Sequence, residues 1–323
     1  MNTDELYMQR CLQLAANGLG RVRPNPLVGC VIVKDGRIIS EGYHQEYGHN
    51  HAERNALLGG ERLKVKGEKA EVSPFTSLLS PLTLYVNLEP CSHYGKTPPC
   101  ADLIVEKGIR RVVCCNDDPN PLVAGNGFRK LEAAGIEVVR HVLEEEGREL
   151  NRRFFTFMEK QRPYVILKWA ESSNGFMAPS TDASYWLSTQ EQNRLNHRWR
   201  TEEAAILVGS ETFLQDSPTL TPRHYLGSAP QPVVLDRRRR LTDVPPHWLH
   251  LHTQTVEETL YTLYEHKLQS VIVEGGRQIL DAFIASGLYD EVRILRSPQC
   301  LGSGLKAPAI PSIAPNRLII IEP

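Results

Sequence analysis

The feature that most constrains the fold of this chain is a set of three metal-binding side chains that lie far apart in the sequence. His51 belongs to the triplet His51-Ala52-Glu53, whereas Cys91 and Cys100 follow some forty residues later. Two thiolates and one imidazole bind zinc and leave the fourth position of a tetrahedral ion open. The fold must therefore bring residue 51 beside residues 91 and 100. Glu53 is not needed as a ligand, so it is free to move protons to and from a zinc-bound water.

The order of these residues is typical of zinc-dependent base deaminases, in which His-x-Glu precedes Pro-Cys and a second Cys. One detail differs, because eight residues separate Cys91 from Cys100 where that pattern has two. The alternative is a structural zinc site, which would need four protein ligands. His93 and His44 are candidates for the fourth ligand. We favour a catalytic site, because both motifs fall at predicted strand–helix junctions.

Size and charge set the broad class of the protein. The 323 residues predict about two domains, and 41% apolar with 23% charged residues is a normal globular balance. The net charge of −1 gives no basic excess to neutralise phosphates, which favours a small-molecule substrate over a nucleic acid. There is no apolar stretch of about 18 residues or more and no signal-like N-terminus, so we expect no membrane association. The seven cysteines, an odd number, favour a reducing, cytoplasmic compartment.

The first half of the chain alternates predicted helices and strands. Asn2 or Thr3 can cap a helix that Gly18 and Gly20 end, and Asp35-Gly36 is a strong hairpin turn. Further helices are expected over 52–58, 101–107 and 127–134, and strands over 28–33, 37–42, 82–88, 111–116 and 136–142. The polar segment 64–81 is expected to be a surface loop. This alternation predicts a layered α/β domain over residues 1–146.

The second half is also predicted to be α/β, with a domain over 163–323 after a helical connector at 147–162. Strands are expected over 164–169, 205–208, 232–235, 270–274, 291–296 and 318–321, and helices over 256–267 and 278–286. The strand ending in Glu274-Gly275-Gly276 precedes a helix, an arrangement that lets a phosphate approach main-chain donors. The G-x-G-x-x-G pattern of dinucleotide-binding domains is absent there. Arg237 to Arg240 is interpreted as a solvated loop.

Several motifs of the first half together resemble the bifunctional deaminase/reductase family of riboflavin biosynthesis. They are Pro24-Asn25-Pro26-Leu27-Val28-Gly29, His51-Ala52-Glu53, Glu89-Pro90-Cys91-Ser92-His93, Gly95-Lys96-Thr97-Pro98-Pro99-Cys100 and Asp118-Pro119-Asn120-Pro121. The resemblance implies a cytidine-deaminase-like three-layer α/β/α domain that hydrolytically deaminates a pyrimidinone ribosyl phosphate. It implies zinc on His51, Cys91 and Cys100, with Glu53 as the catalytic proton shuttle. It further implies substrate contacts from Asn25, His44, His93, Lys96 and Asn120.

The resemblance continues through the second half and implies a dihydrofolate-reductase-like domain that reduces the ribosyl group with NADPH. It is carried by Pro163 to Lys168, Ser172 to Gly175, Trp186, Arg200, Ile206 to Gly209, Thr212, Asp216, Pro218 to Thr221, Arg223 and Glu274-Gly275-Gly276. It implies cofactor contacts from Trp186, Thr212, Asp216 and Gly276. It implies substrate contacts from Ser184, Arg200, Leu220, Arg223 and Glu274, with Lys168 and Asn174 as further candidates. The resemblance also implies a homo-oligomer.

One position departs from the family pattern, since Asn174-Gly175 stands where the family has Asp-Gly. Asn keeps the turn preference but lacks the charge. The sequence therefore leaves open a deaminase whose reductase domain is inactive. Two further alternatives are a nucleic-acid base deaminase and a scaffold protein with a structural zinc site.

Overall fold

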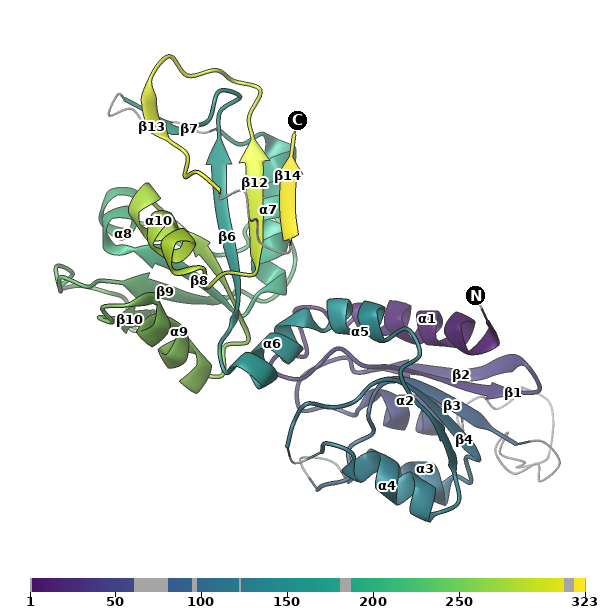
Figure 1. Ribbon diagram of the computed structural model, residues 1–323. Helices are drawn as coiled ribbons and strands as arrows, with labels where there is room; N and C mark the ends of the chain where they lie inside the picture. Colours follow the sequence, from purple (N-terminus) through teal and green to yellow (C-terminus); the bar gives the residue numbers. More distant parts are fainter. Residues whose placement is uncertain are drawn as a thin grey trace. The chain divides into compact units, whose positions relative to one another are not determined.

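The computed structural model describes residues 2–60, 81–94, 98–121, 123–180, 187–310 and 317–322. The chain divides into two compact units, Met1–Glu159 and Lys160–Pro323, and each contains its own main β-sheet (Figure 1). The division falls inside the segment predicted as a connector. Lys96, Ser184, Trp186 and nearly all of the segment 64–81 lie outside the described residues. No described helix is long and apolar enough to cross a membrane.

The first unit is built on a five-stranded mixed sheet in the order β2-β1-β3-β4-β5. The strands are β1 (Gly29–Lys34), β2 (Arg37–Tyr43), β3 (Thr83–Leu88), β4 (Arg111–Asn116) and β5 (Glu137–Val139). β1 is antiparallel to both β2 and β3, whereas β3, β4 and β5 are parallel. The carboxyl ends of β3 and β4 therefore meet at one edge, where the segments after residues 88 and 116 begin.

Helices cover both faces of this sheet, as Figure 1 shows. The helices are α1 (Thr3–Ala16), α2 (Ala52–Gly60), α3 (Cys100–Glu106), α4 (Asn126–Ala133), α5 (Glu144–Leu150) and α6 (Arg152–Lys160). Val31 faces a core shared with α1, whereas its neighbour Ile32 faces a core shared with α2, α3 and α4. Alternate residues of a strand point to opposite faces, so β1 is apolar throughout because both of its faces are covered. The predicted three-layer α/β/α domain is confirmed.

The second unit has a seven-stranded parallel sheet in the order β10-β9-β8-β11-β6-β12-β14. Its strands are β6 (Tyr164–Glu171), β8 (Ala205–Gly209), β9 (Gln231–Leu235), β10 (Leu249–Leu251), β11 (Ser270–Glu274), β12 (Glu291–Arg296) and β14 (Arg317–Ile321). A separate antiparallel ribbon pairs β7 (Phe176–Pro179) with β13 (Gly304–Lys306).

Four helices pack on the second sheet: α7 (Gln190–Glu202), α8 (Ser210–Asp216), α9 (Val256–Glu265) and α10 (Arg277–Ser286). Apolar residues of α9 and α10 share one core with alternate residues of β6, and residues of α7 and α8 belong to the other core. Parallel strands connected through helices are buried on both faces. The predicted α/β class of this half is confirmed.

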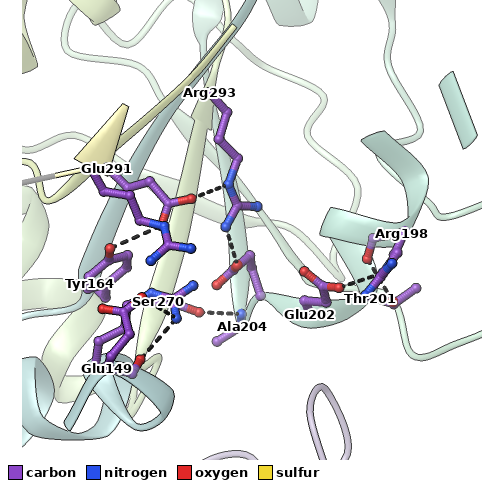
Figure 2. Close-up of polar contacts among 12 residues, drawn as sticks. Glu149, Tyr164, Arg198, Thr201, Glu202, Ala204, Ser270, Glu291 and Arg293 are labelled. Atoms are coloured by element: carbon purple, nitrogen blue, oxygen red, sulfur yellow. Dashed lines mark hydrogen bonds and ion pairs between the residues drawn. The ribbon is translucent and has the colours of Figure 1, made fainter. Parts of the chain in front are cut away.

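A buried group of charges lies near the amino-terminal edge of the second sheet (Figure 2). Nε of Arg293 donates to Glu291 at 2.6 Å and its Nη2 donates to Glu203 at 3.2 Å, while the Tyr164 hydroxyl donates to Glu291 at 3.0 Å. Both glutamates are fully buried. Charges are tolerated in a core only when they are paired and hydrogen-bonded, so this group fixes how β6 and β12 meet the end of α7.

Most predicted elements are present with ends shifted by a few residues, and four differences are larger. The segment 144–160 forms two helices, α5 and α6, instead of one connector helix. The strand predicted over 136–142 is limited to Glu137–Val139. Helices α7 and α8 were not predicted, since the long helix α7 has few apolar residues in its sequence. The short strands β7, β10 and β13 were not predicted.

Candidate zinc centre and reductase site

The three candidate zinc ligands converge at the edge where β3 ends. His51 directly precedes α2, Cys91 follows β3, and Cys100 is the first residue of α3. Nδ1 of His51 lies 3.6 Å from Sγ of Cys91 and 3.5 Å from Sγ of Cys100. Bonds of about 2.0 Å to nitrogen and about 2.3 Å to sulfur place such atoms about 3.5 Å apart around a tetrahedral zinc ion. These residues therefore fit zinc without rearrangement.

The surroundings of Cys91 favour its thiolate, which is the form that binds metal. Hydrogen bonding from the Cys100 thiol and from His51 lowers the pKa of Cys91 to about 4, against the opposing effect of burial. The main-chain N–H of Cys100 also donates to Sγ of Cys91 at 3.4 Å. Helix α3 begins at Cys100, and its first N–H group points at the Cys91 sulfur.

Glu53 lies in the first turn of α2 and is only 3% exposed. Burial raises the pKa of its carboxyl, although His51 and a hydrogen bond with Cys100 counteract the shift. A carboxyl group whose pKa is raised toward neutrality can both accept and return a proton. Its position beside the ligands agrees with the predicted role of proton shuttle.

His44 and His93, the two candidates for a fourth ligand, do not join the cluster. Nδ1 of His44 lies 3.0 Å from the main-chain oxygen of Asn50, and a carbonyl can only accept, so Nδ1 carries the hydrogen. Nε2 of His44 then accepts from Nδ2 of Asn25 at 3.0 Å, and both ring nitrogens are occupied. His93 is exposed. Among the described residues the cluster has three ligands, as expected for a site with an open position.

Two buried asparagines hold the loop that carries Asn25. The side chain of Asn87 accepts from the N–H of Gly29 at 2.7 Å and donates to the carbonyl of Leu27 at 2.9 Å. The side chain of Asn151 accepts from the N–H of Leu27 at 2.8 Å and donates to the same carbonyl at 2.9 Å. These residues were missed from the sequence, because a lone Asn in a strand or helix carries no motif.

A buried carboxylate holds the loop that carries Asn120. Glu89 accepts from the N–H groups of Gly125 and Gly127, each at 2.9 Å. Gly127 must lack a side chain, because a Cβ there would collide with the carbonyl of Pro90. The same loop contains Asp118, whose pKa burial raises to about 7. Because its carboxyl titrates near neutral pH in the loop that carries Asn120, Asp118 is a further candidate for contacting the polar ring of a substrate. It was not among the candidates predicted from the sequence.

The second unit contains a buried ion cluster at the carboxyl end of its central strands. Lys168 and Glu274 are register partners on β6 and β11, and Nζ of Lys168 lies 3.2 Å from Oε1 of Glu274. Nη2 of Arg200, from α7, donates to Oε2 of Glu274 at 2.9 Å. Burial would raise the pKa of Glu274, but the two cations outweigh it and lower the pKa to about 2. The cluster is therefore ionised and rigid.

Thr212 and Gly276, two of the candidate cofactor residues, meet where α8 and α10 begin after the adjacent strands β8 and β11. The N–H of Gly276 donates to Oγ1 of Thr212 at 3.0 Å. Gly275 has φ near 155°, which a side chain rarely adopts. Asp216 is exposed one turn after Thr212, so the two lie on the same face of α8. First turns of two helices offer main-chain donors to phosphate groups.

Two further reductase candidates, Leu220 and Arg223, lie on the segment after α8. Leu220 is buried, with φ of 55°, and Arg223 is exposed. His197, which sequence reasoning missed, accepts from the N–H of His224 at 2.8 Å. Burial and the nearby Arg200 lower the pKa of His197 to about 4, so this ring is neutral. It anchors the segment that carries Arg223.

Asn174 makes contacts that an aspartate could not make in full. Its Nδ2 donates to the carbonyl of Leu301 at 2.6 Å, while its Oδ1 accepts from the N–H of Leu301 at 3.1 Å and from the Ser172 hydroxyl at 2.8 Å. The amide thus joins two loops by using both its donor and its acceptor. These hydrogen bonds explain the asparagine at this position without reference to charge.

The fold and the three-ligand cluster agree with a zinc-dependent deaminase joined to a dihydrofolate-reductase-like domain, and the family matches define this class of protein. The cytidine and deoxycytidylate deaminase zinc-binding region family matches residues 1–116, and the RibD C-terminal domain family matches residues 163–317. The chain belongs to the RibD family of riboflavin biosynthesis enzymes. It is therefore both a hydrolase and an oxidoreductase, with Zn²⁺ and NADPH as cofactors.

Relatives match along nearly the whole chain. The riboflavin biosynthesis protein RibD of Aquifex aeolicus is 38% identical, over 94% of this chain and 89% of its own. RibD of Escherichia coli is 37% identical, over 93% and 89%. The solved structure of Acinetobacter baumannii RibD has a TM-score of 0.83 at 34% identity, covering 94% of this chain and 89% of its own.

Proposed function

We propose that the substrate is 2,5-diamino-6-ribosylamino-4(3H)-pyrimidinone 5′-phosphate, which the first unit deaminates and the second reduces to the ribityl compound. The single observation that carries the proposal is the three-ligand cluster with a buried Glu53 beside it. A Thermotoga maritima structure described as a diaminohydroxyphosphoribosylaminopyrimidine deaminase/5-amino-6-(5-phosphoribosylamino)uracil reductase supports the substrate. It is 38% identical, with a TM-score of 0.81, and the match covers 94% of this chain and 89% of that chain.

In the first unit, His51, Cys91 and Cys100 would hold the zinc, which supplies a water of lowered pKa when bound. Glu53 would accept one proton from the water and return it to the departing amino group, which leaves as ammonia. The hydroxyl group that remains replaces the amino group on the ring, so the protons balance. Asn25 and Asn120 would orient the pyrimidine, because their loops are fixed by Asn87, Asn151 and Glu89. His44 would contribute from the position that its bonds to Asn25 and Asn50 give it. His93 and Lys96 would contact the ring or its ribosyl phosphate.

In the second unit, Thr212, Asp216, Gly276 and Trp186 would bind NADPH, which supplies a hydride when bound. Ser184, Arg200, Leu220, Arg223 and Glu274 would bind the substrate, with Lys168 and Asn174 nearby. Arg200 already pairs with Glu274, so its fixed guanidinium would position the sugar. Arg223 is exposed and suits the phosphate.

The assembly and the compartment also belong to this proposal. Family resemblance supports a homo-oligomer, and the free cysteines support a reducing, cytoplasmic environment.

The test is an assay of the purified protein with the diamino substrate, zinc and NADPH. Both ammonia release and NADPH oxidation are expected, and the absence of both would refute the proposal. Ammonia release without NADPH oxidation would instead identify a deaminase with an inactive reductase unit. The hydrogen bonds of Asn174 argue against that second outcome, because they keep its turn intact without the aspartate charge.

A further inference from the structure

A polar cluster in the second unit has no part in either reaction described above. Asp236 directly follows β9, and His250 and His252 lie on β10 and one residue beyond it. β9 and β10 pair in parallel, with Leu235 opposite Leu251. Side chains two residues apart on a strand point to the same face, and the two imidazole rings lie 4.3 Å apart between centroids. Both histidines therefore face the Asp236 carboxyl.

The distances within this cluster suit a metal ion. One ligand atom from each of the three residues lies within 4.8 Å of the other two. Nε2 of His250 is 3.3 Å from Oδ2 of Asp236. Bonds of about 2.0 Å to nitrogen and oxygen place neighbouring ligands about 3.3 Å apart around a tetrahedral ion. A metal ion could thus replace the proton that now bridges these atoms, with His252 moving toward it.

The Asp236 carboxyl lacks a full set of partners. The residue is 0% exposed, and its Oδ2 accepts from the N–H of Leu241 at 2.9 Å. Among the described residues, none forms a hydrogen bond of acceptable geometry with its buried Oδ1. A buried acceptor without a well-aligned donor costs free energy, so a metal ion at Oδ1 would stabilise this carboxyl. Burial opposes ionisation, but the N–H groups of Leu241 and Arg240 and the ring of His250 lower the pKa of Asp236.

His252 is oriented as a ligand. Its Nδ1 lies 3.0 Å from the main-chain oxygen of Asp236, which can only accept, so Nδ1 carries the hydrogen. In the neutral ring the lone pair is then on Nε2. Metal-bound histidines commonly donate their other N–H to a main-chain carbonyl in this manner, which fixes the tautomer and the ring orientation.

We propose that Asp236, His250 and His252 bind a divalent transition-metal ion such as Zn²⁺, with water at the remaining position. A set of two imidazoles and one carboxylate suits zinc, cobalt or nickel rather than calcium or magnesium. This site would be separate from the thiolate centre of the first unit. The simpler role, an Asp–His contact that ties the edge strand β10 to β9, would not bind an additional ion.

The test is equilibrium dialysis of the full chain against Zn²⁺, followed by measurement of zinc per chain. Wild type should bind two ions, the double variant His250→Gln/His252→Gln one, and the control His266→Gln two. His266 is exposed at the end of α9, away from the cluster. A wild type that binds one ion, a double variant that binds two, or a control that loses an ion would overturn the proposal.

Asp236→Asn provides a second variant that keeps side-chain size and the acceptor for Leu241, and it should also bind one ion. Cobalt separates the two sites, because only the thiolate centre gives a sulfur-to-metal charge-transfer band. The double variant Cys91→Ser/Cys100→Ser should abolish that band while leaving a cobalt ion at the Asp236 cluster. Deamination should stay unchanged in the His250→Gln/His252→Gln variant, which distinguishes failure of this proposal from failure of the proposed function.

Discussion

The zinc cluster of the first unit and the ion cluster of the second are built on opposite principles. His51, Cys91 and Cys100 leave room for a central ion, since their ligand atoms lie at tetrahedral spacing. Lys168, Arg200 and Glu274 instead neutralise one another, with the carboxylate closed between two cations. The first site is chemically incomplete without a metal ion, whereas the charges of the second already neutralise one another in the free protein. The difference predicts that single substitutions in the first site mainly change chemistry, whereas those in the second change stability as well as substrate binding.

The largest effect is expected for Glu53→Gln. Glutamine cannot carry the proton, so deamination should fall about 10²- to 10⁴-fold. Zinc per chain and NADPH oxidation on the deaminated product should not change. Glu46→Gln, an exposed carboxylate in the same unit, is the control and should behave like wild type. Loss of zinc along with activity would show that Glu53 is structural and would remove the contrast between the units.

The next effect concerns the pH dependence of stability in the second unit. Because the pKa of Glu274 is lowered from 4.5 to about 2, its ionisation stabilises the folded state at pH values above 4.5. This contribution, about 3 kcal/mol at 1.36 kcal/mol per unit, should disappear as the pH falls from about 4.5 to about 2.

Urea unfolding over this pH range tests the prediction. The stability difference between wild type and Glu274→Gln should shrink as the pH decreases, whereas Glu265→Gln, exposed at the end of α9, should follow wild type throughout. A difference that stays constant with pH would mean that Glu274 is not held ionised by its neighbours.

A smaller effect is expected for Gly127→Ala in the first unit. The added methyl group would collide with Pro90 and approach Glu89 to 3.0 Å, which should destabilise the unit by about 1–3 kcal/mol. Deamination should fall because the loop carrying Asn120 moves. Gly59→Ala is a matched control, since a Cβ there meets no atom within 4 Å and the residue is helical. Thermal unfolding and ammonia release measure the two effects, and equal behaviour of both variants would contradict the role of Glu89.

The smallest effect is expected for Asn174→Asp in the second unit. Aspartate would lose the bond to the Leu301 carbonyl and place a negative charge against it, at a cost of about 1–2 kcal/mol. NADPH oxidation should not increase. Asn174→Ala separates the lost bond from the added charge and should be milder. An increase in reductase activity with aspartate would instead show that the charge matters for chemistry.

The sequence was most informative where chemistry depends on residue type. Thiolate, imidazole and carboxylate side chains are rare in combination, so His51, Glu53, Cys91 and Cys100 could be singled out before their distances were known. The positions of buried strands were also predictable, because β-branched runs such as Val271 to Val273 are typical of them. Helix α7 was missed because most of its residues are polar. Its capping box at Thr189 and Gln192 is the sequence signal that could have revealed it.

The sequence alone determined the class of chemistry in the first unit, because ligand identity limits the metal and the reaction. Only the tertiary structure decided which groups hold the loops around that chemistry and how the charged residues of the second unit pair. Asn87 and Asn151 lie sixty-four positions apart in the chain. Lys168 and Glu274 lie on two strands, and Arg200 lies on a helix. Asn, Lys, Arg and Glu are common on any surface, so their roles follow from burial and from the partners that strand register supplies.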